Sequence, residues 1–294
     1  MDDIQKGVQD MDKIIIENLK VYAHHGVYKE ENENGQNFYI NAVLYTDTRK
    51  AGLEDRLELS TNYGEVCQFI HQFVRGNLFK LLETLAEKLA EAILIEFRLI
   101  DEVKIEIRKP EAPIGLEFES ISVEIVRKWH TAYLATGSNM GDKKKYIKDA
   151  IVAIAADSKC KIVKTSELVR TTAYGEVEQE EFLNGALMVK TLYTPEELLD
   201  KLHEIEKAEG RERTQHWGPR TLDIDIIFYD DIVMYTDNLQ IPHEDMQNRD
   251  FVLEPLSQIA PYMVHPVFGK TVVQLYEEVQ KVGEKHVIDL EYIR

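Results

Sequence analysis

The segment His216–Asp231, "HWGPRTLDIDIIFYDD", places two aspartates one residue apart inside an otherwise apolar run. Apolar and acidic residues alternate with a period of two from Leu222 to Ile226, which is the spacing of a β-strand. Asp223 and Asp225 are therefore expected on one face of that strand. Like charges on one face repel each other, so either this face is solvated or a cation lies between the carboxylates.

The residues around the strand favour the cation. Carboxylates are hard oxygen ligands suited to Mg²⁺, which proteins often hold through one or two carboxylates plus substrate phosphates. Guanidinium groups bind phosphate oxygens well, and Arg211, Arg213 and Arg220 precede the second aspartate, while His243 and Arg249 follow it. This combination is typical of phosphoryl transfer. The chain lacks a G-x-x-x-x-G-K-[ST] run, which excludes a P-loop.

Length and composition predict a folded chain with two domains. A length of 294 residues exceeds the usual size of one domain. No apolar run approaches the roughly 20 residues that span a bilayer, and the acidic start resembles no targeting peptide. The net charge of −18 argues against a nucleic-acid surface. Cys67 and Cys160 lack metal-ligand spacing. We therefore expect a cytoplasmic protein with free thiols and with neither nucleic acid nor membrane as a partner.

Two blocks of mixed strands and helices meet near Lys128–His130. We expect a short extension (1–10) followed by two α+β domains, 11–128 and 129–294. The first block is expected to begin with a strand from Lys13 that runs into a loop holding His24, His25 and Gly26. Further strands are expected at 36–48, 102–110 and 120–128, with a turn at 60–66 and a helix at 77–98. The second is expected to contain strands at 132–139 and 181–192, a strand followed by a loop within 160–175, and the strand that carries Asp223 and Asp225. Its helices are expected at 143–157, 194–210 and within 241–261, followed by a short tail.

Four stretches of the second block resemble 6-hydroxymethyl-7,8-dihydropterin pyrophosphokinase over residues 130–294. They are "GSNMGD", "RTTAYGEVEQEEFLN", "GRERTQHWGPRTLDIDI" and "IPHEDMQNRDFVLEPL". The resemblance implies a ferredoxin-like core and the transfer of pyrophosphate from ATP to a pterin hydroxymethyl group, which leaves AMP. It also implies two Mg²⁺ ions. Two departures are visible: Ala173 stands where the family usually has proline, and the arginine loop is shorter than in some members.

The same resemblance assigns the residues of this site. It implies that Asp223 and Asp225 hold both metal ions and that Arg211 and Arg220 act in catalysis. The residues it implies for ATP are His203, Arg213, Trp217, Ile226, His243 and Arg249, and those for pterin are Thr171, Tyr174, Phe182, Asn184 and Phe251. A single aromatic side chain is most often part of the core. Phe182 and Asn184, however, share a strand face, and an aromatic beside an amide suits a flat heterocycle.

Four stretches of the first block resemble dihydroneopterin aldolase over residues 11–128. They are "VYAHHGVYKEENENGQNF", "STNYGEV", "LLETLAEKLAE" and "IEIRKPEAPI". The resemblance implies the tunnelling fold (T-fold), a homo-oligomer with sites between subunits, and no metal. The implied reaction cleaves 7,8-dihydroneopterin to glycolaldehyde and 6-hydroxymethyl-7,8-dihydropterin.

In this first site the resemblance places Lys109, Tyr63 and Glu31 at catalytic positions, and Glu83, Leu82 and Tyr63 against the pterin. A retro-aldol step needs a base for a hydroxyl proton and an acid for the enamine carbon, and Lys109 and Tyr63 can supply them through a water. A carboxylate such as Glu83 can accept the two adjacent N–H groups of a pterin. Its alternative role is one charge on a solvated helix face.

The adjacent residues His24 and His25 are candidate metal ligands, but neighbours on a strand point to opposite faces, which favours a structural role.

The product of the first implied reaction is the substrate of the second. The leading hypothesis is therefore a bifunctional enzyme of folate biosynthesis with pterins and ATP as its small-molecule partners. Two alternatives stay open from the sequence. The first block could be an oligomerisation scaffold, or the second could be a nucleotide-binding module that performs no transfer.

Overall fold

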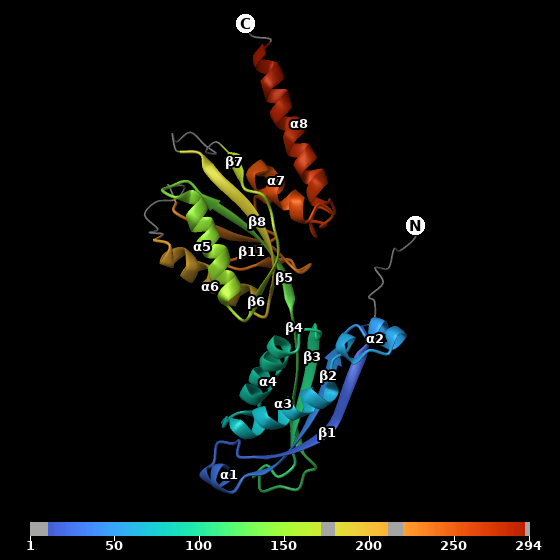
Figure 1. The fold of residues 1–294 in the computed structure, drawn as a ribbon. Coiled ribbons are helices and arrows are strands. Elements are labelled where there is room, and N and C mark those ends of the chain that lie inside the picture. The colour runs from blue at the N-terminus through green and yellow to red at the C-terminus, as the bar shows by residue number, and fades with distance from the viewer. Residues whose placement is uncertain (1–10, 172–179, 211–219, 292–294) are drawn as a thin grey trace. The chain divides into compact units, whose positions relative to one another are not determined.

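The computed structural model describes residues 11–171, 180–210 and 220–291. The chain divides into two compact units, Met1–Trp129 and His130–Arg294 (Figure 1). We expected the boundary after Lys128. Trp129 belongs to the first unit because its backbone N–H donates to the Asp101 carbonyl and its indole Nε1 donates to the Leu94 carbonyl at 3.2 Å.

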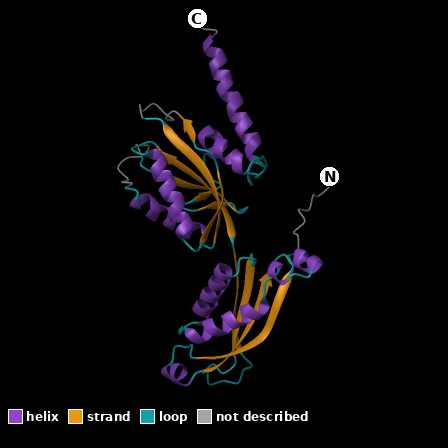
Figure 2. Ribbon diagram, in the orientation of Figure 1, coloured by secondary structure: helices purple, strands orange, loops and turns teal. Residues whose placement is uncertain are grey.

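The first unit is one antiparallel sheet with helices on one face (Figure 2). The sheet has the order β1-β2-β3-β4. Its strands are β1 (Lys13–Ala23), β2 (Gln36–Tyr45), β3 (Glu102–Lys109) and β4 (Ile121–Lys128). Its helices are α1 (Lys29–Asn34), α2 (Arg49–Glu54), the 3₁₀ turn η1 (Leu57–Leu59), α3 (Tyr63–Gly76) and α4 (Leu82–Glu96). The α+β class and the order of strands and long helices fit the tunnelling fold that the resemblance implied.

Alternation along β2 and β3 builds the core of this unit. Phe38, Ile40, Ile105 and Ile107 have no exposed surface, and the residues between them are half-buried. Apolar residues every second position form one continuous face against α3 and α4. Lys109 is the last residue on the buried face of β3, so its charged side chain lies at the edge of the core.

Two sequence predictions in this unit are wrong. The stretch 60–66, expected as a turn, contains the start of α3, because the Asn62 side chain caps the backbone N–H groups of Gly64 and Glu65. The helix expected from Asn77 begins only at Leu82. The apolar stripe of α3, Val66, Ile70 and Val74, recurs at helical spacing, so the sequence carried a signal for this helix that the predicted turn left unused.

The second unit contains a five-stranded antiparallel sheet. Its main path has the order β6-β8-β5-β9, and β7 pairs with β8. The strands are β5 (His130–Ser138), β6 (Cys160–Thr165), β7 (Val169–Thr171), β8 (Phe182–Thr191) and β9 (Asp223–Tyr229), with a separate ribbon of β10 (Met234–Tyr235) and β11 (Gln240–Ile241). The helices are α5 (Lys143–Ala156), α6 (Pro195–Ala208), the 3₁₀ turn η2 (Met246–Asn248), α7 (Asp250–Ile259) and α8 (Val272–Glu291). The order β5-α5-β6-β8-α6-β9 along the chain is the βαββαβ arrangement of a ferredoxin-like fold, as predicted.

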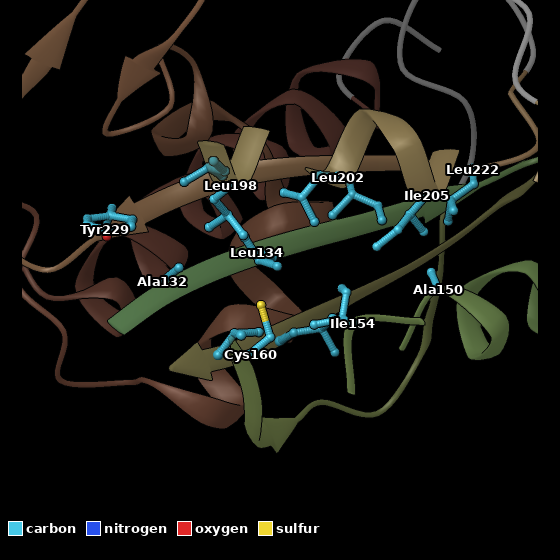
Figure 3. Close-up of a cluster of buried hydrophobic side chains, with 14 of the residues drawn as sticks. Ala132, Leu134, Ala150, Ile154, Cys160, Leu198, Leu202, Ile205, Leu222 and Tyr229 are labelled. Atoms are coloured by element: carbon cyan, nitrogen blue, oxygen red, sulfur yellow. The ribbon is translucent and has the colours of Figure 1, made fainter. Parts of the chain in front are cut away.

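Each face of this sheet has its own core. Leu134 packs with Leu198 and Leu202 of α6 (Figure 3). Ile224 and Ile226 of β9 belong to the same cluster. The opposite face packs against α7 through a second cluster that includes Ala135, Ile227 and Leu253.

A bulge changes the register of β9 near its end. Tyr133 pairs with Phe228 but Leu134 pairs with Ile226, so one residue is inserted at Ile227. Ile227 and Phe228 therefore both face α7.

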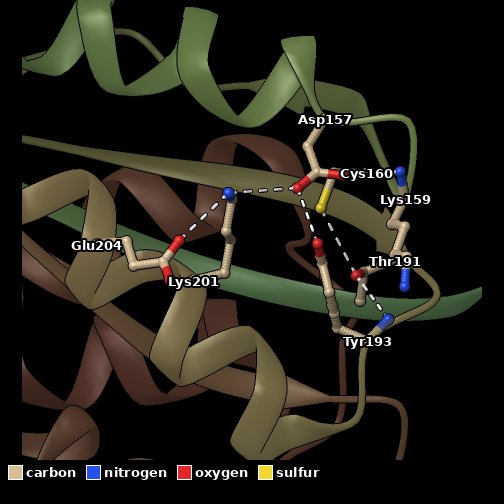
Figure 4. Close-up of polar contacts among 7 residues, drawn as sticks. All are labelled: Asp157, Lys159, Cys160, Thr191, Tyr193, Lys201 and Glu204. Atoms are coloured by element: carbon tan, nitrogen blue, oxygen red, sulfur yellow. Dashed lines mark hydrogen bonds and ion pairs between the residues drawn. The ribbon is translucent and has the colours of Figure 1, made fainter.

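The helix α6 starts as predicted. Thr194 Oγ1 accepts the N–H of Glu197, and the Glu197 side chain accepts the N–H of Thr194, which is a capping box. Polar contacts tie its first turns to the end of α5, since Asp157 accepts the Tyr193 hydroxyl at 2.9 Å and lies 3.7 Å from Lys201 Nζ (Figure 4). These contacts lie at the end of the sheet opposite Asp223.

The short tail expected at the C-terminus is instead the helix α8, so this prediction is wrong. Its start carries an apolar stripe at helical spacing, Val272, Leu275, Tyr276 and Val279, and these side chains join the core beneath α7. No helix in the described ranges has the length and apolar character needed to cross a membrane.

Candidate active sites

Asp223 and Asp225 open β9 and lie on one face of it, as the alternation predicted. Asp223 pairs with Gly137 of β5, which pairs in turn with Asn184 of β8. Asp225 pairs with Ala135, which is also small. These small residues place no large side chain of β5 beside the carboxylates, on the face that α7 covers further along the sheet.

The two aspartates differ in the charged groups that surround them. Arg220 forms an ion pair with Asp223. Burial, together with the negative charges of Asp223 and Glu206, raises the pKa of Asp225 to about 7, against the opposing effect of Arg220 and Arg249. A carboxyl group in this setting gains from a bound cation.

The residues present fit magnesium. No group of three or more His, Cys, Asp or Glu residues that could hold a metal occurs among the residues that the structure describes. Two carboxylates are nevertheless what Mg²⁺ commonly takes from a protein when substrate phosphates and water complete its shell.

Two further residues of this site escaped the sequence analysis. The buried carboxylate of Glu206 accepts the N–H of Ile224 at 2.8 Å, between the two aspartates. Asn139 clamps Arg220, because its Oδ1 accepts the Arg220 N–H at 2.7 Å and its own N–H donates to the Arg220 carbonyl at 3.1 Å. The sequence carried a signal for Glu206, which stands four residues after Leu202 on the apolar stripe of its helix.

His243 and Arg249 lie near the aspartates, as expected for phosphate contacts. The His243 backbone N–H donates to the Ile227 carbonyl of β9. His243 Nδ1 accepts the Asp245 N–H at 3.3 Å, so the neutral ring carries its hydrogen on Nε2 and can donate to an anion. Burial lowers the pKa of His243, and the nearby charge of Arg249 lowers it further.

Two other residues predicted for ATP lie differently. The side chain of Ile226 is buried in the core beneath α5 and α6, so only its main chain is available to a ligand. His203 lies on α6 one helical turn before Glu206, whose carboxylate accepts the Ile224 N–H of β9. The assignment of His203 to ATP stays a prediction.

The described pterin candidates lie along β7, β8 and the start of α7. Thr171 pairs with Phe182 in the sheet, and Asn184 Nδ2 donates to Thr171 Oγ1 at 2.7 Å. Phe251 packs against the α7 core, with the Arg249 guanidinium 5.9 Å from its ring centre. Tyr174, Arg211, Arg213 and Trp217 lie outside the described residues.

The first unit brings Glu31 and Lys109 together. Lys109 Nζ donates to Glu31 Oε1 at 2.5 Å, and each residue is only 8% exposed. Glu31 also accepts the Tyr28 N–H at 3.0 Å and the Gln36 Nε2 at 3.3 Å. Burial opposes ionisation of Glu31, but these donors outweigh burial and lower the pKa of its carboxyl group. The pair is a buried, fixed charge pair at the edge of the core.

Tyr63 and Glu83 lie at the first turns of α3 and α4, where both are exposed, and Leu82 beside Glu83 is half-buried. Within the described ranges, no hydrogen bond or ion pair joins Tyr63 or Glu83 to Glu31 or Lys109.

The two histidines differ in their surroundings. His24 is exposed, whereas His25 is buried, accepts the Phe79 N–H on Nδ1 at 3.1 Å and stacks on the Phe79 ring. These contacts favour the structural role for His25.

Known proteins match both units. A family model described as 7,8-dihydro-6-hydroxymethylpterin-pyrophosphokinase (HPPK) matches residues 133–261. The 2-amino-4-hydroxy-6-hydroxymethyldihydropteridine pyrophosphokinase of Aquifex aeolicus is 40% identical over 148 residues, which cover 50% of this chain and 91% of that protein. The chain belongs to the hydroxymethyldihydropterin pyrophosphokinase family. The same family resemblance was predicted from the sequence.

The first unit of this pyrophosphokinase-family chain is an aldolase-family domain, because the model of dihydroneopterin aldolase (FolB) matches residues 14–126. The folic acid synthesis protein FOL1 of Dictyostelium discoideum is 34% identical over 305 residues, covering 95% of this chain and 46% of that protein. The bifunctional protein FolKE of Lactococcus lactis (strain IL1403) is 49% identical over 129 residues, covering 44% of this chain and 37% of that protein. The chain thus spans less than half the length of these two relatives.

Proposed function

We propose that the chain catalyses two consecutive steps of folate biosynthesis. The first unit cleaves 7,8-dihydroneopterin to glycolaldehyde and 6-hydroxymethyl-7,8-dihydropterin. The second transfers pyrophosphate from ATP to the hydroxymethyl group and releases AMP. The observation that carries the proposal is that each family-matched unit holds charged groups suited to its reaction, the buried Glu31–Lys109 ion pair in one and Asp223 and Asp225 on one strand face in the other.

In the pyrophosphokinase unit, Asp223 and Asp225 would hold two Mg²⁺ ions, which when bound neutralise charge on the phosphates. Arg220 forms an ion pair with Asp223 in the structure. With a metal ion on Asp223, the Arg220 guanidinium would be available to bind a phosphate. His243 donates from Nε2, and Arg249 adds a positive charge close to Asp225. Arg211, Arg213, Trp217 and His203 complete the set assigned to ATP. Most of the work is positioning and charge neutralisation.

The pterin of this second reaction is proposed to lie between Phe182 and Phe251, with Asn184 and Thr171 at its edge and Tyr174 beside it. Asn184 has a carbonyl and an amide on one side chain, so it can both accept from and donate to the ring edge. Its Nδ2 bond to Thr171 orients that amide in the absence of pterin.

In the aldolase unit the reaction moves one proton off a hydroxyl group and one onto carbon. Removing the proton of the side-chain hydroxyl at C2′ breaks the C1′–C2′ bond and releases glycolaldehyde. The electron pair passes into the ring as an enamine, and a proton added at C1′ gives the hydroxymethyl product. We assign these transfers to Lys109 and Tyr63, with Glu31 holding Lys109 and with Glu83 and Leu82 against the ring.

A second copy of the chain is proposed to complete this site. Tyr63 and Glu83 make no bond to the Glu31–Lys109 pair within the described part of one chain, and both are exposed. A homo-oligomer formed through the first unit would unite the two parts. We place both reactions in the cytoplasm, which agrees with Cys67 and Cys160 being free thiols.

Removal of magnesium should separate the two activities. With EDTA present, glycolaldehyde release from dihydroneopterin should continue unchanged, because no metal is assigned to that step. AMP formation from ATP and 6-hydroxymethyl-7,8-dihydropterin should stop and return when Mg²⁺ is restored. Both products can be measured by chromatography. Glycolaldehyde release that needs Mg²⁺ would contradict the first assignment, and ATP binding without AMP formation would favour a nucleotide-binding module.

Replacing Asn184 by leucine should weaken pterin binding in the second unit. Leucine has a similar volume but offers neither hydrogen bond, so the KM for hydroxymethyldihydropterin should rise by about 10- to 100-fold. The KM for ATP should change little. The matched control is Asn248→Leu, since Asn248 is an exposed amide of the same unit. Equal KM values for pterin in Asn184→Leu and the unchanged protein would remove Asn184 from the pterin site.

A further inference from the structure

Gln36 is a buried glutamine beside the Glu31–Lys109 pair, at the first position of β2. Its side chain is 5% exposed, and its Nε2 donates to Glu31 Oε1, the oxygen that also accepts Lys109. Its own carbonyl, Oε1, is buried and has no hydrogen-bond partner. Buried polar atoms without partners are uncommon in native proteins, and each calls for an explanation.

The carboxylate that Gln36 contacts cannot turn away. The N–H of Tyr28 holds Glu31 Oε2 at 3.0 Å. Gly26 lies directly against the carboxylate, and a Cβ added there would come within 2.2 Å of Oε2. Two hydrogen bonds fix Gly26. Its N–H donates to the Phe79 carbonyl, and its carbonyl accepts from Asn32 Nδ2. The Glu31 oxygens therefore have fixed directions.

This fixed carboxylate determines where the free carbonyl of Gln36 lies. Nε2 and Oε1 belong to one planar amide, so a bond from Nε2 to Glu31 keeps Oε1 next to the charged pair. Lys109 donates to Glu31 and makes no bond to Gln36 Oε1. A buried acceptor without a partner beside a reactive pair is suited to receive a hydrogen from a ligand.

We propose that Gln36 is a positioning residue of the aldolase site. Its amide N–H fixes the Glu31 oxygen that bonds Lys109, and its carbonyl accepts a hydroxyl hydrogen. That hydrogen comes from the substrate's trihydroxypropyl side chain or from a water held beside it. The inference rests on the proposed aldolase activity. It adds a contact that would distinguish a pterin with a trihydroxypropyl side chain from one with only a hydroxymethyl group.

Gln36→Met tests this role, because methionine keeps the length of the side chain and removes both hydrogen bonds. We expect the kcat for glycolaldehyde release to fall by about 10- to 100-fold, since the site loses the carbonyl that receives the hydroxyl hydrogen and the Glu31 oxygen that bonds Lys109 loses one of its donors. Glu31 loses a donor to its charged form, so the acid limb of the pH profile should move to higher pH. AMP formation from supplied hydroxymethyldihydropterin should stay within about twofold, as an internal measure of intact protein.

Two ligands separate the sources of the hydrogen. If a substrate hydroxyl bonds Gln36, then Gln36→Met weakens binding of neopterin more than that of 6-hydroxymethylpterin, which lacks the outer hydroxyls. If a water bonds Gln36, both affinities fall equally. Gln36→Glu keeps an acceptor but places a second carboxyl group beside Glu31, which raises the pKa of the carboxyl pair. It should preserve the preference for neopterin and shift the pH profile to higher pH. It serves as the second variant if Gln36→Met fails to fold.

The matched control is Asn37→Met. Asn37 is the next residue on β2, on its opposite face, and its Nδ2 donates to Glu111 at 3.3 Å. The inference is overturned if Gln36→Met keeps the kcat and pH profile of the unchanged protein, or if Asn37→Met shows the same losses. Absence of glycolaldehyde release from the unchanged protein would instead overturn the proposed aldolase activity.

Discussion

Asp225→Asn is expected to abolish AMP formation while glycolaldehyde release continues at its full rate. Asparagine keeps the shape of the side chain and removes the negative charge that would hold Mg²⁺. Loss of several kcal/mol of charge stabilisation corresponds to a fall of about 1,000-fold or more in kcat. Burial and the negative charges of Asp223 and Glu206 already disfavour a charged side chain at this position. A neutral asparagine should therefore leave the stability of the unit unchanged. Both products are measured on the same preparation.

The control for this variant is Asp231→Asn. Asp231 is an exposed carboxylate just beyond the end of β9, so it changes the net charge equally at a site without a proposed ligand. It should leave both rates unchanged. If Asp225→Asn forms AMP at a rate within tenfold of the unchanged protein, the aspartate pair does not hold the metal ions.

Lys109→Met should have the complementary effect. Glycolaldehyde release should fall by about 100- to 10,000-fold, the usual contribution of a positioned proton-transfer group, while AMP formation from supplied hydroxymethyldihydropterin continues. Neopterin binding, followed by fluorescence, should persist because the ring contacts are assigned to Glu83 and Leu82. The change leaves Glu31 as an unpaired buried charge, and stability of the first unit should fall by about 3–5 kcal/mol.

Lys104→Met is the matched control, since Lys104 lies on the same strand, on the opposite face, and forms its own ion pair with Glu124 at 2.9 Å. It should retain full aldolase activity. The double variant Glu31→Gln/Lys109→Met removes both charges and should recover stability without recovering turnover. If turnover survives in Lys109→Met, or if neither Lys109→Met nor Glu83→Ala changes any rate, the first unit is a scaffold.

The strand-borne residues of both sites were predictable because a strand fixes side-chain direction every second residue. The alternation around Asp223 and Asp225 placed them on one face, as observed. The same rule places Lys109 with Val103, Ile105 and Ile107 on the buried face of β3. Local periodicity is sufficient where function depends on the direction of one strand.

Contacts between distant segments could not be predicted in this way. Asn139 meets Arg220 across 81 residues and Gln36 meets Glu31 around a short helix, and neither contact leaves a periodic signal. The helix α8, by contrast, does carry a periodic signal in the helical spacing of Val272, Leu275 and Val279, although only a short tail was predicted there. The resemblance supplied the roles of Tyr63 and Glu83, which nothing in their surroundings within one chain would suggest.

A coupled time course tests the central claim most directly. The intact chain is given dihydroneopterin as the sole pterin, together with ATP and Mg²⁺, and glycolaldehyde and AMP are followed in parallel. We expect glycolaldehyde to appear first and AMP to follow after a lag, never exceeding the glycolaldehyde formed. AMP that accumulates without glycolaldehyde, or that appears only after hydroxymethyldihydropterin is added from outside, would contradict the assignment of two consecutive reactions to one chain.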